Sequence, residues 1–370
     1  MKCRILIDAN MLLALYSYET PNLKLIYEFL MEYENLLEFV LTDIIVDEWL
    51  RNREKKIEHS IKNFKEANKR FGEPNIIKEL ETYEKYAEAK KKMLELAEKA
   101  VGEAKERARS KKLFADKIAA QIIEKARKFI CKDDESIFML AQRRMSYGNP
   151  PGKHGELGDR LTWEALLKNL EDGDLFILTD DSDFLSPLQQ RVGSCTEDKV
   201  SSLLHMNTNE FLRDEWRSKR RGKLYLIRNW RCFIEYFSTH DPCDSLKDAK
   251  SESRPKILGL LRAFERSKAV ERLVNSGSFK ETHKSIEALM AFDDFSKSEL
   301  LDLMKAYTEN SQIAWIIDDV DVKEFAEKLL GLAEAYFDDE DIRKSADKLQ
   351  SLLGAKRDPQ KEFLDEDLPF

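Results

Sequence analysis

The sequence predicts an α/β fold: a parallel-sheet domain at residues 1–245, followed by an all-α module at residues 246–370. Two short aliphatic runs, at residues 3–7 and 175–179, each stop at an aspartate and are followed by helix-like sequence. Uninterrupted apolar runs of this length are typical of parallel strands that helices bury on both faces. Beyond about residue 250 the sequence has no such runs, and amphipathic helical patterns replace them.

The remaining elements follow in chain order from the same periodicity rules. Helices are expected at residues 11–15 and 23–37, a strand at 39–42, and another helix from residue 44. From about residue 51 to 130 Lys, Glu and Ala dominate, with one break at residues 72–74, so we expect an extended helical hairpin inserted into the domain. Later strands are expected around 203–206 and at 223–227, and C-terminal helices at 254–275, 281–308 and 320–353.

The composition is that of a helix-rich protein with long solvated faces. Charged residues make up 36% of the 370 residues, and the net charge is −8. A negative total does not exclude nucleic acid as a partner, because a local basic surface can coexist with acidic helices. The five cysteines are odd in number and form no Cys-x-x-Cys pair, so we expect reduced thiols in a cytoplasmic protein. We expect neither a signal peptide nor a membrane span, because no apolar stretch is long enough for one.

Acidic side chains stand at or near predicted strand ends in four places of the chain. The carboxyl ends of parallel strands meet at one edge of a sheet, where open α/β folds place their sites. Carboxylates that gather there repel each other, and a hard divalent cation such as Mg²⁺ or Mn²⁺ is the natural reason to bring them together. The acids concerned are Asp8, Glu48, Asp159, Asp180, Asp181 and Asp183.

These motifs, in this order, resemble those of PIN-domain nucleases. The resemblance is carried by Ile5-Leu6-Ile7-Asp8-Ala9-Asn10, an acid beyond a second strand, Gly158-Asp159-Arg160-Leu161-Thr162-Trp163 and Leu178-Thr179-Asp180-Asp181-Ser182-Asp183-Phe184. It is strongest with a bacterial branch that has a long helical insertion, a Pro-Pro-Gly-Lys loop and a Gly-Asp-x-x-x-Trp motif. It spans about residues 1–235 and leaves the C-terminal module unaccounted for. It implies a PIN-like fold and a metal-dependent endonuclease acting on RNA, with one or two Mg²⁺ or Mn²⁺ ions.

The resemblance also implies roles for particular residues. Bound cations would lower the pKa of an attacking water and stabilise charge on the phosphodiester, so a cage of carboxylates suffices. By position, the metal-binding and catalytic acids would be Asp8, Glu48, Asp159, Asp181 and Asp183. Asn10 and Thr179 stand where small polar residues support the site, whereas Asp180 occupies a variable position. Four basic residues near the acids can hold substrate phosphate or simply balance charge: Arg143, Arg144, Lys153 and Arg160.

Each motif also has an ordinary structural interpretation. Asp8 and Asp183 can cap helices, and Asp159 can be a charge in a first helical turn. Asp43 and Asp47 are neighbours of Glu48, and only one or two of these three acids can face the sheet edge. A basic stretch can be a nucleic-acid track with stacking aromatics, or a solvated helix with its tryptophans in the core. Its members are Arg213, Arg217, Lys219, Arg220, Arg221, Lys223, Arg228 and Arg231, with Trp216 and Trp230.

Other protein classes fit these residues less well. A Toprim nuclease has a glutamate after its first strand, where this chain has Asp8, and a haloacid-dehalogenase phosphatase has a second aspartate where Asn10 stands. A structure-specific or single-strand DNA nuclease stays open, and so does a degenerate scaffold that acts as an interaction protein. The substrate can be a structured RNA such as tRNA, and the biological role can be toxin, phage defence or housekeeping. We expect the C-terminal helices to serve a homodimer or a regulatory protein partner.

Overall fold

The computed structural model describes residues 2–69, 75–153, 155–188, 204–241 and 253–354. The chain divides into two compact units, Met1–Leu258 and Gly259–Phe370. The expected boundary between residues 245 and 246 lies outside the described residues. In the described part of unit 1, five parallel strands form one sheet, which confirms the predicted fold class. The strands are β1 (Cys3–Ile7), β2 (Leu37–Thr42), β3 (Arg127–Phe129), β4 (Leu175–Leu178) and β5 (Leu224–Ile227).

The strand order β3-β2-β1-β4-β5 places β1 at the centre of the sheet. Ile5 of β1 is in register with Phe39 of β2 on one side and with Phe176 of β4 on the other. The chain therefore winds outward from β1 in one direction as far as β3 and then crosses to the opposite side of β1. Such a reversal leaves a crevice at the carboxyl ends of the two strands that flank it, here β1 and β4.

Helices bury both faces of the sheet, which explains the uninterrupted apolar runs of β1 and β4. All five residues of β1 and all four of β4 are buried. Aromatic contacts fasten the helices, as between Phe29 and Phe233, with ring centroids 5.5 Å apart, and between Trp163 and Trp216, 5.7 Å apart. The helices of unit 1 near the sheet are α1 (Ala9–Ala14), α2 (Thr20–Glu32), α5 (Phe114–Lys125), α6 (Glu135–Ser146), α7 (Gly158–Asn169), α9 (Glu210–Arg220) and α10 (Trp230–Thr239).

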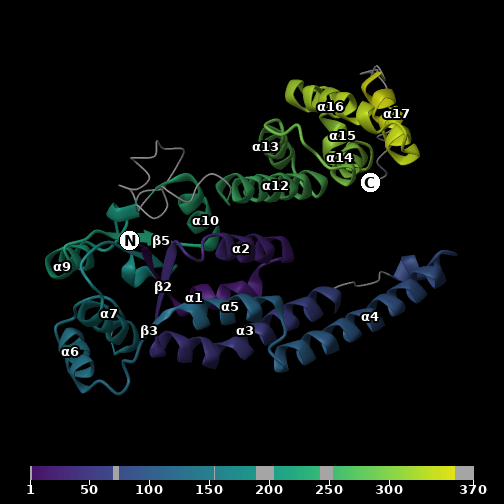
Figure 1. Cartoon of the computed structure of the whole chain (residues 1–370). Coiled ribbons are helices and arrows are strands. Elements are labelled where there is room, and N and C mark those ends of the chain that lie inside the picture. Colours follow the sequence, from purple (N-terminus) through teal and green to yellow (C-terminus); the bar gives the residue numbers. More distant parts are fainter. Residues whose placement is uncertain (1, 70–74, 154, 189–203, 242–252, 355–370) are drawn as a thin grey trace, which may run out of the picture. The chain divides into compact units, whose positions relative to one another are not determined.

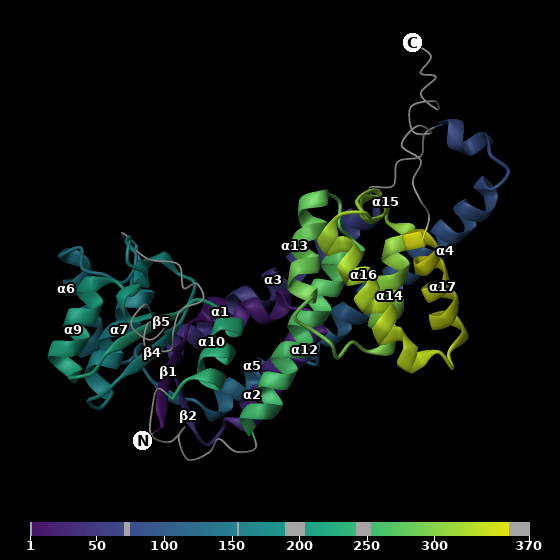
Figure 2. The same ribbon diagram turned by 90° about the horizontal axis from the view of Figure 1, so that it is seen from above.

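A long helical hairpin extends from the sheet domain, as expected from the Lys, Glu and Ala composition (Figures 1 and 2). It consists of α3 (Asp43–Lys69) and α4 (Tyr83–Arg109). The expected insertion of residues 51–130 was too long at its C-terminal end, because α5 packs against β2 and β3 joins the sheet. The base of the hairpin is anchored by a buried ion pair, in which Arg53 Nε lies 2.7 Å from Asp116 Oδ1.

Two other expectations for unit 1 were wrong. Residues 204–206, part of the strand expected at 203–206, are helical. The helix expected at residues 23–37 ends at Glu32, because Leu37 already pairs with Cys3 in the sheet. The strand expected at 223–227 and the helix after it are present as β5 and α10.

Unit 2 is helical throughout its described part and has a hydrophobic core of its own. This core runs from Ala269 to Leu349. The helix expected at 281–308 is divided, because Ser296 starts a new helix with a capping box to Glu299. The helix expected at 320–353 is divided as well, and Asp339 Oδ1 accepts the amide of Ile342 where the second part begins. The helices are α12 (Ser253–Val274), α13 (Phe279–Leu289), α14 (Lys297–Glu309), α15 (Ser311–Trp315), α16 (Val320–Ala333) and α17 (Glu340–Gly354).

The cysteines depart from the expectation of five reduced thiols. Cys131 and Cys232 are free, but Cys3 at the start of β1 is disulfide-bonded. The expectation was therefore wrong for Cys3. Within the described ranges, no helix combines the length and apolar character that crossing a membrane requires.

Candidate active site

Asp8 and Thr179 meet at the carboxyl ends of the two central strands. Asp8 follows β1 directly, and its Oδ1 accepts the amide of Ala9 at 2.6 Å, which caps α1. Its Oδ2 accepts the hydroxyl of Thr179, which follows β4, at 2.5 Å. The capping interpretation of Asp8 is therefore correct, and it does not conflict with the site interpretation, which stays a prediction. Both oxygens keep a further lone pair, because each accepts a single hydrogen bond among the described residues.

Thr179 connects three parts of the site through one hydroxyl. While its proton goes to Asp8, its oxygen accepts the side-chain amide of Asn10 at 3.2 Å and the backbone amide of Asp181 at 3.0 Å. Thr179 is completely buried. Asn10 and Thr179 thus lie where the sequence placed supporting polar residues, and they fix the orientation of Asp8 and the start of the Asp181 turn.

Asp181 and Asp183 belong to a single turn after β4. Asp181 Oδ1 accepts the amide of Asp183 at 3.1 Å and caps the 3-10 helix η3 (Ser182–Phe184). The Oδ2 atom of Asp183 is buried and has no hydrogen-bond partner among the described residues. Asp180 instead forms an exposed ion pair with Arg228, whose Nη2 lies 2.6 Å from Asp180 Oδ1. The turn therefore separates Asp180 from the other two acids, in line with its variable position.

The structure also distinguishes Glu48 from the two acids beside it. Asp43 accepts the backbone amides of Cys131 at 2.9 Å and Lys132 at 3.2 Å, so it ties the end of β3 to the start of α3. Asp47 pairs with the ammonium group of Lys132. Glu48 is half-buried and has no ion pair or hydrogen bond to its carboxylate in the described part of the chain. Its charge acts on Asp8 and on Asp159.

Asp159 lies in the first turn of α7, and its carboxylate likewise has no hydrogen-bond partner among residues that the structure describes. Its electrostatic partners are the other four acids, Asp8, Asp181, Glu48 and Asp183. Four segments distant in sequence therefore bring five carboxylates together, which we call the acidic cluster: Asp8, Glu48, Asp159, Asp181 and Asp183.

Burial and mutual repulsion raise pKa values within the acidic cluster. Burial, followed by the charges of Asp8, Asp181, Glu48 and Asp183, raises the pKa of Asp159 to about 7. Burial also raises the pKa of Asp8 to about 6, although the hydrogen bonds from Thr179 and Ala9 oppose the shift. The pKa of Asp183 is raised by burial and by Asp181, and Lys153 lowers it. The cluster is therefore an unfavourable concentration of negative charge that a cation would relieve.

The donor set fits a hard divalent cation. It consists of carboxylate oxygens, one of them the buried and unpartnered Asp183 Oδ2, and hard ions such as Mg²⁺ prefer oxygen ligands. Among the described residues, no three His, Cys, Asp or Glu side chains already lie close enough to hold one ion.

The four basic residues expected near the site have different surroundings. Arg144 is 5% exposed and pairs with Glu164 and Glu215, so its expected phosphate contact is corrected to a structural role. Arg160 is 3% exposed, and its guanidinium donates to the carbonyls of Gly152 at 2.7 Å, Lys153 at 2.8 Å and Glu156. It is therefore occupied with the backbone, and its expected role as a phosphate ligand is corrected to a structural one. Lys153 is exposed and acts on Asp183. Arg143 is exposed in the last turn of α6, and no described contact links it to the acidic cluster.

The basic stretch at residues 213–231 is not a track of stacking aromatics. Trp216 and Trp230 are both buried, and their indole N–H groups each donate at 3.0 Å, to the carbonyls of Gly173 and Met11 respectively. The interpretation that places both tryptophans in the core is therefore the correct one.

Sequence reasoning missed Glu156, whose charge also raises the pKa of Asp183. Its position two residues before Gly158-Asp159 was the only available signal, and acids in loops are too common for that signal to be decisive.

A family model described as PIN domain matches residues 5–184. The matched range contains the end of β1, all of β2, β3 and β4, and all five members of the acidic cluster. Neither the curated proteins nor the solved structures contain a match to the chain. The resemblance drawn from the sequence motifs is thus confirmed for the sheet domain, and the match leaves unit 2 without an assignment.

Proposed function

We propose that the PIN domain at residues 5–184 is a metal-dependent endonuclease that hydrolyses phosphodiester bonds, with RNA as its substrate. PIN domains are, as a family, nucleases acting on nucleic acids. The observation that carries the proposal is the acidic cluster, in which burial and four neighbouring carboxylates raise the pKa of Asp159 to about 7. RNA as substrate rests on the motif resemblance described above.

The residues of the site would have defined roles in the proposed reaction. Bound Mg²⁺ or Mn²⁺ would supply a water of lowered pKa and would stabilise charge on the phosphate. Asp8, Glu48, Asp159, Asp181 and Asp183 would bind the ion or ions, and Thr179 would hold Asp8 in one orientation. Asn10 would support this arrangement through its hydrogen bond to Thr179.

The test is cleavage of a panel of RNA and single-stranded DNA by the full chain, with and without Mg²⁺ or Mn²⁺. We expect metal-dependent cleavage of RNA, and we expect Asp8→Asn and Asp159→Asn to lower kcat by at least about 100-fold, because each removes a ligand charge. Asp180→Asn is the matched control, since Asp180 is exposed and paired with Arg228. Its activity should stay within about threefold of the parent, as is usual for exposed positions.

Other outcomes of this test would favour the alternatives. Metal-dependent cleavage of DNA alone would retain the nuclease and overturn the choice of RNA. A folded protein that binds Mg²⁺ and Mn²⁺ but cleaves none of the substrates would point to an interaction scaffold instead. Equal activity of Asp8→Asn and the parent would remove the acidic cluster from the chemistry.

A further inference from the structure

A short loop next to the acidic cluster is held from inside the protein by two buried arginines. We call residues 148–153, Gly-Asn-Pro-Pro-Gly-Lys, the lysine loop. Arg160, one residue after Asp159, donates to the carbonyls of Gly152 at 2.7 Å and Lys153 at 2.8 Å. Arg144 reaches the other end of the loop and donates to the carbonyl of Pro150 at 2.7 Å. The backbone on both sides of Gly152 is therefore fixed.

Arg144 is itself fixed by a buried ionic network. Its Nε lies 2.7 Å from Glu164 of α7, and its Nη2 lies 2.7 Å from Glu215 of α9. Glu215 also accepts the indole N–H of Trp163 at 2.8 Å. Arg144 is 5% exposed, and burying a charge is costly unless it is paired and hydrogen-bonded, as it is here. The lysine loop is thus bound to the packed core of the domain.

Gly152 is required for this arrangement. Its φ is +96°, a conformation that side-chain-bearing residues rarely adopt. A Cβ atom at this position would lie 2.9 Å from Nη1 of Arg160, which is too close for a normal contact. The close approach of the guanidinium to the loop therefore depends on a glycine.

The lysine loop presents one cation, and the described protein does not neutralise it. Lys153 is exposed and forms no ion pair within the described residues, although its charge acts on Asp183. A nucleic acid backbone that approaches five carboxylates is repelled by them, so a fixed positive charge at the border of the cluster would favour the approach. A loop that is rigid before binding also loses little entropy when it binds.

We propose that the lysine loop is a preformed clamp for a backbone phosphate of the substrate beside the acidic cluster. Lys153 contacts the phosphate, and Arg144 and Arg160 are positioning residues that act through the loop. This clamp rests on the proposed nuclease function, because it assigns the substrate phosphate a place next to the cluster. It replaces the direct phosphate contact expected of Arg160 by an indirect role.

The test measures binding of a short fluorescent oligoribonucleotide to the full chain at several salt concentrations. Asp8→Asn serves as the parent, so that cleavage does not interfere. In this parent, Lys153→Ala should weaken binding several-fold and lower the slope of log K against log salt by about 0.7, the value for one phosphate contact on a single strand. Lys153→Arg should retain the slope, and Lys24→Ala, which removes an exposed lysine from α2, should match the parent.

If Arg160 acts by positioning Lys153, substitutions of the two residues should weaken RNA binding through the same contact. Arg160→Gln should lower the slope by a similar amount, and adding it to Lys153→Ala should cause little further loss, because both act on one contact. With Asp8 intact, KM should rise more than kcat falls in both variants. Gly152→Ala gives a second way to displace the guanidinium if Arg160→Gln does not fold, and it should reproduce the Lys153→Ala slope.

The outcomes separate the clamp from the nuclease. An unchanged salt slope in Lys153→Ala, additive losses in the double variant, or no RNA binding by the parent would each overturn the clamp. Cleavage by the wild type together with an unchanged slope in Lys153→Ala would leave the nuclease standing without the clamp. A wild type that cleaves nothing, combined with the predicted slopes, would retain the clamp and overturn the nuclease.

Discussion

The hydroxyl of Thr179 is the residue-scale feature on which the site most depends. Replacing Thr179 by valine keeps the shape but leaves Asp8 Oδ2 without its donor and the amide of Asp181 without an acceptor. We expect the free energy of unfolding to fall by about 1–3 kcal/mol, as for other buried groups left unpaired. The pKa of Asp8 should rise above about 6, because the bond from Thr179 lowers it. Chemical unfolding and NMR titration of the metal-free protein measure both effects. Thr179→Ser should retain both properties, and equal values for valine and threonine would contradict this role.

The raised pKa of Asp159 makes stability depend on pH in a defined direction. In the folded, metal-free protein the pKa of Asp159 is about 7, against a usual value of 3.8. Between these two values the folded state therefore holds a proton that the unfolded chain releases. This contribution is fully present below about pH 4 and is lost as the pH rises through 7. Asp159→Asn should therefore unfold with a free energy about 1–3 kcal/mol higher than the wild type at pH 8 in a chelator, and about the same at pH 4. Thermal unfolding across this range is the measurement. If Asp180→Asn also raised the free energy of unfolding at pH 8, the effect would not be specific to Asp159.

Strand periodicity predicted the acids that follow strands, whereas the acids on helices, Glu48 and Asp159, were named only through the motif resemblance. Asp8 and Asp181 follow β1 and β4, so strand periodicity alone places them at the sheet edge. Periodicity alone could not separate Glu48 from Asp43, because Asp43 binds the amides of Cys131 and Lys132, which lie about ninety residues further along. Arg160 was misassigned for a similar reason, because the direction of a long side chain depends on the path of the loop that it contacts.

At the scale of elements, the main omission was β3. Three residues, Arg127 to Phe129, give too short a pattern to be distinguished from the end of a helix. The strand lies at the edge of the sheet, where Arg127 pairs with Glu171 at 2.8 Å, and edge strands need no continuous apolar run. The hairpin helices were predicted well, because their charge-rich amphipathic pattern continues over 27 residues in each of α3 and α4.

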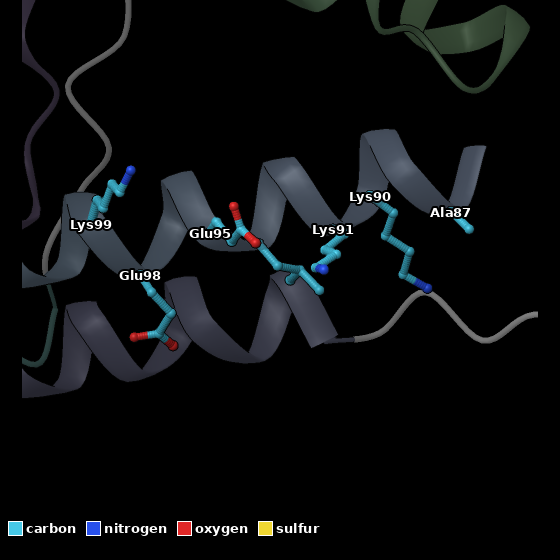
Figure 3. Close-up of a pocket in the computed structure, with 7 residues that line it drawn as sticks. Ala87, Lys90, Lys91, Glu95, Glu98 and Lys99 are labelled. Atoms are coloured by element: carbon cyan, nitrogen blue, oxygen red, sulfur yellow. The ribbon is translucent and has the colours of Figure 1, made fainter. Parts of the chain in front are cut away.

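The helical hairpin is expected to restrict which RNA reaches the site. Its outer part is strongly charged, and α4 presents Lys90, Lys91, Glu95, Glu98 and Lys99 along a shallow pocket (Figure 3). We predict that replacing residues 66–97 by a Gly-Ser linker leaves a folded protein that still cleaves single-stranded RNA but loses its preference for structured RNA. Folding should persist because Lys65 and Glu98, which are 3.0 Å apart, mark a short crossing point and the Arg53–Asp116 ion pair is retained.

Mapping the cleavage sites on a tRNA and on an unstructured RNA of equal length tests the hairpin's role. The charge-matched control variant keeps the whole hairpin and carries the same linker as an insertion between residues 72 and 73. A folded deletion variant whose cleavage sites are the same on both RNAs as in the wild type would disprove the restriction.

At the scale of the whole molecule, the chemistry and the C-terminal helices belong to separate units. All members of the acidic cluster lie in Met1–Leu258, whereas the core from Ala269 to Leu349 is built within Gly259–Phe370. The acids of unit 2 act locally, as when Asp339 accepts an amide at a helix start. His283 has a raised pKa because Asp321 accepts its Nδ1–H at 2.7 Å, and this pair joins α13 to α16. A role of unit 2 in assembly or regulation stays a prediction.

A chain that ends at residue 258 should therefore fold and retain metal-dependent cleavage. The end point matters, because the first turns of α12 belong to unit 1: Lys256 lies 2.5 Å from Glu32 and 3.1 Å from Glu28, and Ile257 is fully buried. A chain that ends at residue 250 should consequently be less stable, by about 1–3 kcal/mol for the buried isoleucine alone. Cleavage rate, unfolding free energy and mass in solution measured for both fragments and the full chain test this division. If the 1–258 fragment is folded and has the mass of a monomer but cleaves nothing that the full chain cleaves, unit 2 completes the active site and the division is wrong.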